Sequence, residues 1–271
     1  MDEQELKNFF KRTFDDVAEG YDNASMRFFP DTAARIPEFL GLKGYEHVLD
    51  VATGTGVVAL AMAAALPEGK VTGIDISPGM LAQAVRKKDS IGRDNVTFME
   101  MDMTRLGFPA DHFDAAVCAF GIFFINDMKR QLSHISEKVK TGGRVMTTTF
   151  SFGSFSPLAD IFLERLKKYG IEPPTMSWKR ISSVEQCKEL FGSSGLADIE
   201  CQKVDAGYYL DDADDWWHII WNGGFRGLVN KLSDDDRERF RVEHLEEIDD
   251  LSDGEGIKLE MEVLYTRGTR V

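Results

Sequence analysis

The chain has 271 residues, of which 43% are hydrophobic and 29% are charged. This composition is typical of a globular protein and excludes a disordered or collagen-like chain. Acidic residues outnumber basic ones by 46 to 32, and residues 211–255 alone carry fifteen acidic and five basic residues. Such a surface repels the phosphates of nucleic acids and anionic lipid, so we expect neither nucleic acid nor a membrane as a partner. A solvated acidic face is the simplest interpretation of residues 211–255.

Three cysteines (Cys118, Cys187 and Cys201) are too few and too scattered for a disulfide framework or a zinc site. We therefore expect reduced, buried thiols and no metal. The N-terminal residues contain no basic and apolar segments of a signal peptide, and the longest apolar run, Val57–Leu66, is too short to span a membrane. These features predict a cytoplasmic chain.

Residues 47–150 alternate short apolar runs with helical stretches, which is the pattern of βαβ units and a parallel sheet. The expected helix from the glycine turn to Leu66 has no polar face, so we expect it to be covered on all sides. Ser77 and Pro78 are typical of a helix start. The expected strands are 47–51, 70–75, 95–101, 113–120 and 144–150, the last one following a turn at Gly142–Gly143.

After Phe150 the pattern changes. Apolar residues recur at helical spacing from Leu158 to Tyr169 and stop at Gly170, and Ser183–Gln186 fits a capping box for another helix. Residues 199–204 and 257–266 are expected strands, and the alternation of apolar and polar residues in 257–266 predicts a position at the sheet edge. Two helical segments are expected within residues 211–245.

Three aspartates (Asp50, Asp75 and Asp102) each lie at the carboxyl end of an expected parallel strand, at the edge where open α/β sheets bind ligands. Either Asp50 or Asp75 alone could merely cap a helix or brace a loop, but all three together indicate a nucleoside site. Asp75 is placed to accept hydrogen bonds from a ribose diol, and Asp102 from an exocyclic amine. The glycines of the first turn (Gly54 and Gly56) permit close approach of a ligand, and Ile76 and Met103 could enclose an adenine ring.

The run Gly54–Ala59 also fits the G-x-G-x-x-A fingerprint of dinucleotide-binding proteins, so an NAD-dependent oxidoreductase is the main alternative enzyme. Asp50 argues against it, because a dinucleotide places its pyrophosphate at this helix N-terminus. A carboxylate about 4 Å from a phosphate oxygen costs on the order of 1–4 kcal/mol. The same carboxylate favours an ammonium group, and therefore a nucleoside that carries an amino acid.

Taken together, these motifs resemble the class I S-adenosylmethionine-dependent methyltransferases, most of all the branch of ubiquinone/menaquinone-biosynthesis and related small-molecule enzymes. The resemblance implies an α/β, doubly wound, Rossmann-like fold with a seven-stranded, mostly parallel sheet, an antiparallel last strand and a helical cap. Two positions depart from the family pattern: Ala52 stands where many members have glycine, and Phe123–Phe124 where quinone-ring members tend to have Arg-Asn. The second departure favours related small-molecule enzymes over quinone-ring C-methylation. The resemblance rests on the runs VLDVATGTG (48–56), GIDISPGML (73–81), MD (101–102), FD (113–114), FG (120–121) and TGGR (141–144).

The resemblance also implies roles for individual residues. The turn at Ala52, Thr53, Gly54 and Gly56 would bind the methionine tail with Asp50 behind it, and Phe120 would lie beside the methionine portion. Tyr21 is a lid contact in this view. The resemblance further implies that the whole chain, 1–271, would form one methyltransferase domain, with a lid at 1–40, a cofactor-binding core at 41–150, cap insertions at 151–182 and 211–245, and the rest of the core at 183–210 and 256–271.

Methyl transfer is an in-line displacement that depends on alignment, which can supply about 7–11 kcal/mol of the barrier. A general base is needed only if the acceptor must lose a proton, and His218 is the candidate for that role. It lies among three tryptophans (Trp216, Trp217 and Trp221) that form either core or pocket. The cap predicts a small, largely apolar acceptor, lined by Phe28, Phe29, Phe152 and Phe155 unless these rings are plain core. A non-catalytic cofactor-binding module is the remaining alternative, and the sequence specifies no oligomeric state.

Overall fold

The computed structural model describes residues 3–271, which form two compact units. The sheet unit comprises residues 29–152, 177–204 and 263–271. The helical unit comprises the described residues up to 28, together with 153–176 and 205–262. Met1 and Asp2, with which the expected lid begins, lie outside the described residues.

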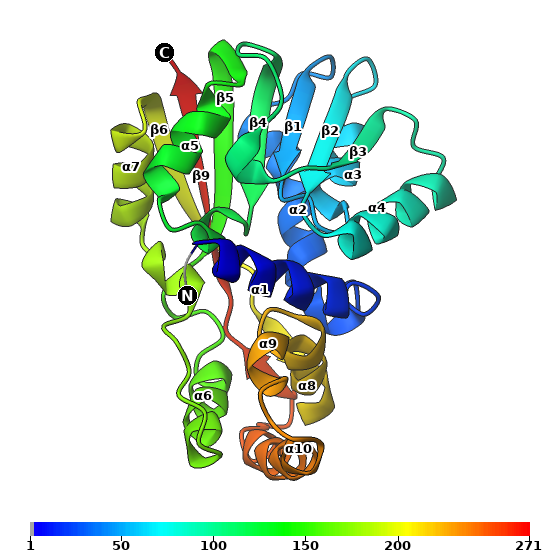
Figure 1. The fold of residues 1–271 in the computed structure, drawn as a ribbon, viewed down its shortest axis with the longest axis vertical. Helices are drawn as coiled ribbons and strands as arrows, with labels where there is room; N and C mark the ends of the chain where they lie inside the picture. Colours follow the sequence, from blue (N-terminus) through cyan, green and yellow to red (C-terminus); the bar gives the residue numbers. More distant parts are fainter. Residues whose placement is uncertain (1–2) are drawn as a thin grey trace. The chain divides into compact units, whose positions relative to one another are not determined.

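The sheet unit is built on one seven-stranded sheet with the strand order β3-β2-β1-β4-β5-β9-β6 (Figure 1). The first five strands pair in parallel, and β9 pairs antiparallel with β5. This confirms the predicted fold class. The strands are β1 (His47–Val51), β2 (Lys70–Asp75), β3 (Val96–Glu100), β4 (Phe113–Ala119), β5 (Val139–Phe150), β6 (Leu196–Asp205) and β9 (Glu262–Arg270).

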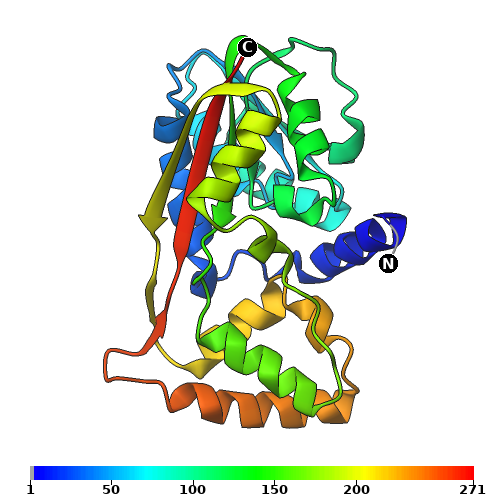
Figure 2. The ribbon, with the colours of Figure 1, turned by 90° about the vertical axis from the view of Figure 1, so that its left-hand side faces the viewer.

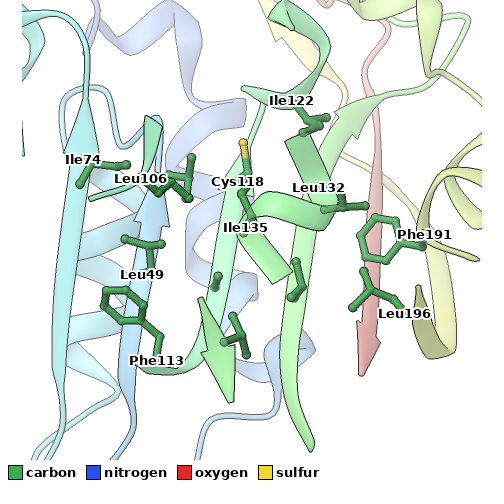
Figure 3. Close-up of a cluster of buried hydrophobic side chains, with 14 residues drawn as sticks. Leu49, Ile74, Leu106, Phe113, Cys118, Ile122, Leu132, Ile135, Phe191 and Leu196 are labelled. Carbon is green, nitrogen blue, oxygen red and sulfur yellow. The ribbon is translucent and has the colours of Figure 1, made fainter. Parts of the chain in front are cut away.

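Helices cover both faces of this sheet (Figures 1 and 2). On one face lie α2 (Phe28–Leu40) and α3 (Val57–Ala64), and on the other lie α5 (Met128–Ser136) and α7 (Val184–Ser193). Figure 3 shows the apolar cluster beneath α5 and α7, to which Leu49, Phe113 and Phe191 contribute fully buried side chains. Each such side chain contributes about 1.5–3 kcal/mol by leaving water.

Local sequence signals determine several helix ends as predicted. Ser77 caps α4 (Pro78–Ser90) by accepting a hydrogen bond from the Met80 amide at 3.1 Å. Ser183 and Gln186 form the predicted capping box of α7. The helix α6 (Leu158–Lys168) ends before Gly170, whose φ of 74° suits glycine.

Four expectations about elements are wrong. The strand β5 begins at Val139 and runs through Gly142–Gly143, because an irregularity in its pairing with β4 absorbs the extra residues. The expected edge strand 257–266 is two strands, and β9 lies inside the sheet with Val263–Thr266 all buried. In α3, Ala64 is exposed, so this helix is not covered on all sides. Residues 211–245 contain three helices rather than two.

The helical unit contains α1 (Glu3–Val17), α6, α8 (Ala213–Asn222), α9 (Arg226–Val229) and α10 (Asp234–Asp249). Its short sheet pairs β7 (Tyr208–Leu210) antiparallel with β8 (Ile257–Leu259). In its core the indole of Trp216 donates to His244 Nε2 at 2.9 Å, and burial lowers the pKa of His244 to about 3. The guanidinium of Arg165 pairs with Glu243 and Glu247, which ties α6 to α10. Among residues 3–271, no helix is long and apolar enough to cross a membrane.

Candidate functional site

The carboxyl ends of β1, β2 and β3 lie side by side, because these strands are parallel neighbours. Asp50 is the second-last residue of β1, and Asp75 is the last residue of β2. Asp102 does not end β3 as expected, since that strand stops at Glu100. It instead begins the short helix η2 (Met103–Arg105). All three carboxylates still belong to the same edge of the sheet.

Asp50 is a fully buried carboxyl group whose two oxygens differ. Its Oδ2 accepts a hydrogen bond from the Thr53 hydroxyl at 2.6 Å, whereas Oδ1 has no hydrogen-bond partner among the described residues. Burial, with a smaller contribution from the nearby Asp75, raises the pKa of Asp50 to about 7, although the Thr53 hydrogen bond opposes that shift. An incompletely satisfied buried acid favours a cationic or hydrogen-bond-donating ligand.

The turn that follows β1 has three residues in the left-handed region, with φ of 58° at Ala52, 54° at Gly54 and 79° at Gly56. Ala52 pays a conformational cost of about 1–3 kcal/mol for this φ, which a glycine would avoid. A Cβ at Gly56 would clash with the Phe98 ring at 2.7 Å, but a Cβ at Gly54 would meet nothing within 4 Å. Gly56 is therefore required by packing, whereas Gly54 leaves open space beside the turn.

Asp75 connects this turn to the next one. Its Oδ2 accepts from the Gly54 amide at 2.8 Å, and its Oδ1 accepts from the Ser77 amide at 2.9 Å. An ionised carboxylate has about four acceptor positions, so these two bonds orient the group and leave it capable of accepting from a diol. Asp102 Oδ1 accepts from both the amide and the hydroxyl of Thr104, at 2.9 and 2.8 Å. Both acids thus brace loops, as the sequence allowed for Asp75, and both remain at the edge of the sheet.

Aromatic rings line the adjoining ends of β4 and β5. Phe120 has a φ of 51°, unusual for so large a residue. Its ring stacks on Phe150 with centroids 4.5 Å apart and meets Phe29 edge to face at 5.2 Å. Phe150 in turn contacts the buried Trp178 edge to face at 6.1 Å. Sequence reasoning missed Phe150 and Trp178, although Phe150 ends a parallel strand next to β4 and could have been found by the same edge argument as the aspartates.

The remaining predicted residues are distributed over both units. Ile76 and Met103 are half-buried directly after Asp75 and Asp102. Tyr21 belongs to the helical unit, where its ring meets Phe14 edge to face at 6.2 Å. Trp216 and Trp217 are buried core residues of that unit, whereas His218 is exposed on α8. Phe28 and Phe155 pack on each other inside the helical unit, and Phe152 is 71% exposed.

These residues fit a nucleoside that carries an amino acid. The orphaned Oδ1 of Asp50 suits an ammonium group, the space at Gly54 suits a close ligand, and Asp75 is oriented by two backbone amides. Within residues 3–271, no group of three or more His, Cys, Asp or Glu side chains is arranged to hold a metal ion. The carboxylates, backbone amides and aromatic rings at this edge can recognise and orient a ligand.

Comparisons with known proteins agree with this geometry. A family model described as a methyltransferase domain matches residues 48–143. The aklanonic acid methyltransferase DauC of Streptomyces sp. (strain C5) is 28% identical over 182 residues, which are 66% of this chain and 83% of that protein. The demethylmenaquinone methyltransferase of Thermus thermophilus is 32% identical over 160 residues, which are 56% of this chain and 72% of that protein. In structure, the YcgJ protein of Bacillus subtilis shares the fold with a TM-score of 0.61 and 22% identity, over 89% of this chain and 98% of that one.

The fold and the edge site define a methyltransferase of the Rossmann-like class. The chain belongs to the class I S-adenosylmethionine-dependent methyltransferases. Its reaction is the transfer of a methyl group to a small molecule. S-adenosylmethionine is its cofactor. The NAD-dependent oxidoreductase and the non-catalytic module, both open from the sequence, are thereby set aside.

Proposed function

We propose that the edge formed by β1 to β4 holds S-adenosylmethionine, with the buried carboxyl of Asp50 as the feature that carries the assignment. The turn at Ala52, Thr53, Gly54 and Gly56 would receive the amino-acid end of the cofactor. Support comes from Oδ1 of Asp50, which has no hydrogen-bond partner among the described residues, and from the open space at Gly54, since a buried acid without a full set of partners is stabilised by a donor.

The nucleoside end is assigned to the two other acids. Asp75 would accept hydrogen bonds from the ribose hydroxyls, and Asp102 from the adenine amine. The half-buried side chains of Ile76 and Met103 would lie against the adenine faces. This assignment is supported by the order of the strands, because β1, β2 and β3 are successive neighbours and present their ends in the same order as the parts of the nucleoside.

When bound, the cofactor supplies a methyl group on a positively charged sulfur, which an acceptor atom displaces in line. The residues of this chain have to orient the acceptor and keep water out. Phe120 lies at the end of β4 with its ring held between Phe29 and Phe150, and we assign it to the methionine portion. An aromatic face at that position attracts a cationic sulfur.

The acceptor we propose is small and largely apolar. The apolar row Phe29, Phe120 and Phe150 supports this, as do the names of the similar methyltransferases for aklanonic acid and demethylmenaquinone. We further propose that residues 1–40 act as a lid with Tyr21 as a contact, and that 151–182 and 211–245 form the cap. A general-base role for His218 stays a prediction. Because its ring is exposed on α8, it could take a proton from the acceptor only if the acceptor binds next to that helix.

Calorimetric titration of the Asp75→Asn variant with S-adenosylhomocysteine tests the assignment. Asparagine keeps the size of the side chain but loses the charge, and each charge-assisted hydrogen bond contributes about 1.5–3 kcal/mol. We expect at least tenfold weaker binding. Glu100→Gln, at the neighbouring end of β3, is the matched control and should leave affinity unchanged. Unchanged affinity in Asp75→Asn would remove Asp75 from the site.

A further inference from the structure

The loop that follows β3 is held by hydrogen bonds from a neighbouring helix of the sheet unit. This loop, residues 102–106, includes the short helix η2. The side-chain amide of Gln131 donates to the Met103 carbonyl at 2.7 Å, and the Leu106 amide donates to His134 Nε2 at 3.1 Å. Gln131 and His134 lie three residues apart on α5, so they project from the same side of that helix. The 102–106 loop is therefore bonded to α5 at two points.

The helix α5 is a rigid support for this loop, because its inner side is packed on the sheet. Leu132 and Ile135 are fully buried in the apolar cluster of Figure 3, and Leu106 of the loop belongs to the same cluster. Gln131 is buried as well, and a buried amide that loses its partner is costly. Apolar packing and the two hydrogen bonds thus hold the loop against the same helix.

The two hydrogen bonds run in opposite directions, which determines how the loop lies along α5. Gln131 donates to a carbonyl, whereas His134 accepts from an amide. Because an N–H donates to Nε2 of His134, the hydrogen of the neutral ring is on Nδ1, which lies 3.5 Å from Glu137 Oε2. A shift of the loop along the helix would lose both bonds. The pair of side chains therefore specifies one position of the loop.

The Asp102 carboxylate moves with this loop, because the amide and the hydroxyl of Thr104 both donate to its Oδ1. We propose, on the basis of the cofactor site assigned above, that Gln131 and His134 are positioning residues for adenine recognition. They hold Asp102 and Met103 where the adenine amine and one ring face are bound, and so determine the preference for a 6-amino purine. Neither side chain touches the cofactor. A loop that is about 1 Å looser would lose this preference.

Calorimetric titration with two ligands tests this role. One is S-adenosylhomocysteine, and the other is its analogue in which a hydrogen atom replaces the 6-amino group of adenine. The ratio of the two affinities measures recognition of the amine. In the wild-type chain we expect at least tenfold tighter binding of S-adenosylhomocysteine, because only this ligand offers an amine to the Asp102 carboxylate. Asp102→Asn should bring the ratio close to one, since an NH₂ group cannot accept from the amine.

Substitutions on α5 separate positioning from stability. Gln131→Met keeps the length of the side chain without its donor, and His134→Phe keeps a ring without its acceptor. Each should lower the affinity ratio several-fold. His134→Gln should preserve the ratio, because its side-chain oxygen can accept from the Leu106 amide. Ser133→Ala is the matched control, since it removes a hydrogen bond of α5 to the Ser194 carbonyl and none to the loop. It should leave the ratio unchanged even where thermal stability falls.

Hydrogen–deuterium exchange of the wild-type chain gives a second measurement that needs no variant to fold. The amides of Thr104, Arg105 and Leu106 all donate to atoms of the loop or of α5. Peptides that cover the 102–106 loop should therefore be protected before any ligand is added. Rapid exchange in the ligand-free chain, with protection only after S-adenosylhomocysteine binds, would overturn the positioning role.

The affinity ratios distinguish failure of the positioning role from failure of the cofactor site. A tenfold wild-type ratio that is retained in both Gln131→Met and His134→Phe would overturn the role of α5 and leave the cofactor site standing. A wild-type ratio of one would refute the assignment of Asp102 to the adenine amine, and the role of α5 with it. Loss of S-adenosylhomocysteine binding altogether would refute the proposed site itself.

Discussion

At the scale of single residues, the most consequential side chain is Asp50, because its burial changes both stability and binding. Burial raises its pKa from 3.8 to about 7. The folded chain therefore holds a proton that the unfolded chain has lost between about pH 4 and 7. The free energy of unfolding falls as pH rises through this window, by at most roughly 4 kcal/mol. The buried Asp50 thus lowers the stability of the fold near neutral pH, and a cationic ligand would offset that loss.

We expect the affinity for S-adenosylhomocysteine to rise as pH increases from 6 to 7.5, by up to about tenfold. The reason is that an ammonium group favours the ionised form of Asp50, which is scarce below its pKa. The charged group that acts on Asp50 is Asp75, a second acid, which supplies no cation. Calorimetry at both pH values measures the change. In Asp50→Asn, binding should be weak and nearly independent of pH, and stability above pH 7 should exceed that of the wild type; an unaltered pH dependence in this variant would refute the role.

At the scale of elements, the two glycines of the turn between β1 and α3 have different roles, since Gly56 is needed for packing and Gly54 is assigned to ligand binding. Gly56→Ala should destabilise the fold, since its Cβ would meet Phe98 at 2.7 Å and Ala84 at 2.9 Å. Gly54→Ala has room for its Cβ and carries mainly the cost of a positive φ, about 1 kcal/mol. We expect that variant to remain folded and to lose at least tenfold in cofactor affinity, because its Cβ enters the space proposed for the ligand.

Gly142 provides a matched control for the strain of this substitution. It also has a positive φ, 80°, and open space around a Cβ, but it lies near the start of β5, at the opposite end of that strand from Phe150. Thermal unfolding of Gly142→Ala and Gly54→Ala should shift by similar amounts, whereas only Gly54→Ala should lose affinity. Equal affinity in both variants would show that Gly54 does not border the cofactor.

Elements differ in how far the sequence could predict them. The strands β1, β2 and β4 were predictable because largely buried parallel strands are short apolar runs, and the ends of β1 and β2 placed Asp50 and Asp75 at the sheet edge. The edge strand β3 has only one buried residue, Val96, so burial does not explain its prediction. The interior position of β9 was not predictable, because alternation along a strand describes its two faces and says nothing of the strands beside it. The same limit hid the Phe120–Phe150 stack, which depends on which elements become neighbours, and the partial exposure of Cys201, where three buried thiols were expected.

At the scale of the whole molecule, the net charge of −14 affects which form of the cofactor is favoured. S-adenosylmethionine carries one more positive charge than S-adenosylhomocysteine, because its sulfur is a sulfonium. A negative field therefore attracts the methyl donor over the demethylated product. Raising ionic strength from about 0.01 M to about 1 M shortens the Debye length from about 30 Å to about 3 Å.

We expect this change in salt to weaken binding of the methyl donor a few-fold more than binding of the product, as measured by calorimetry at both ionic strengths. Salt screens the short-range attraction to the buried Asp50 much less. The part of the binding affinity that changes with salt therefore measures the electric field of the whole chain. Neutralising exposed acids that precede β2 and β3, for example with Glu68→Gln and Asp94→Asn, should reduce the salt effect without touching the site at the carboxyl ends of these strands. Equal loss for both ligands would instead mean that discrimination between donor and product is local to the edge of the sheet.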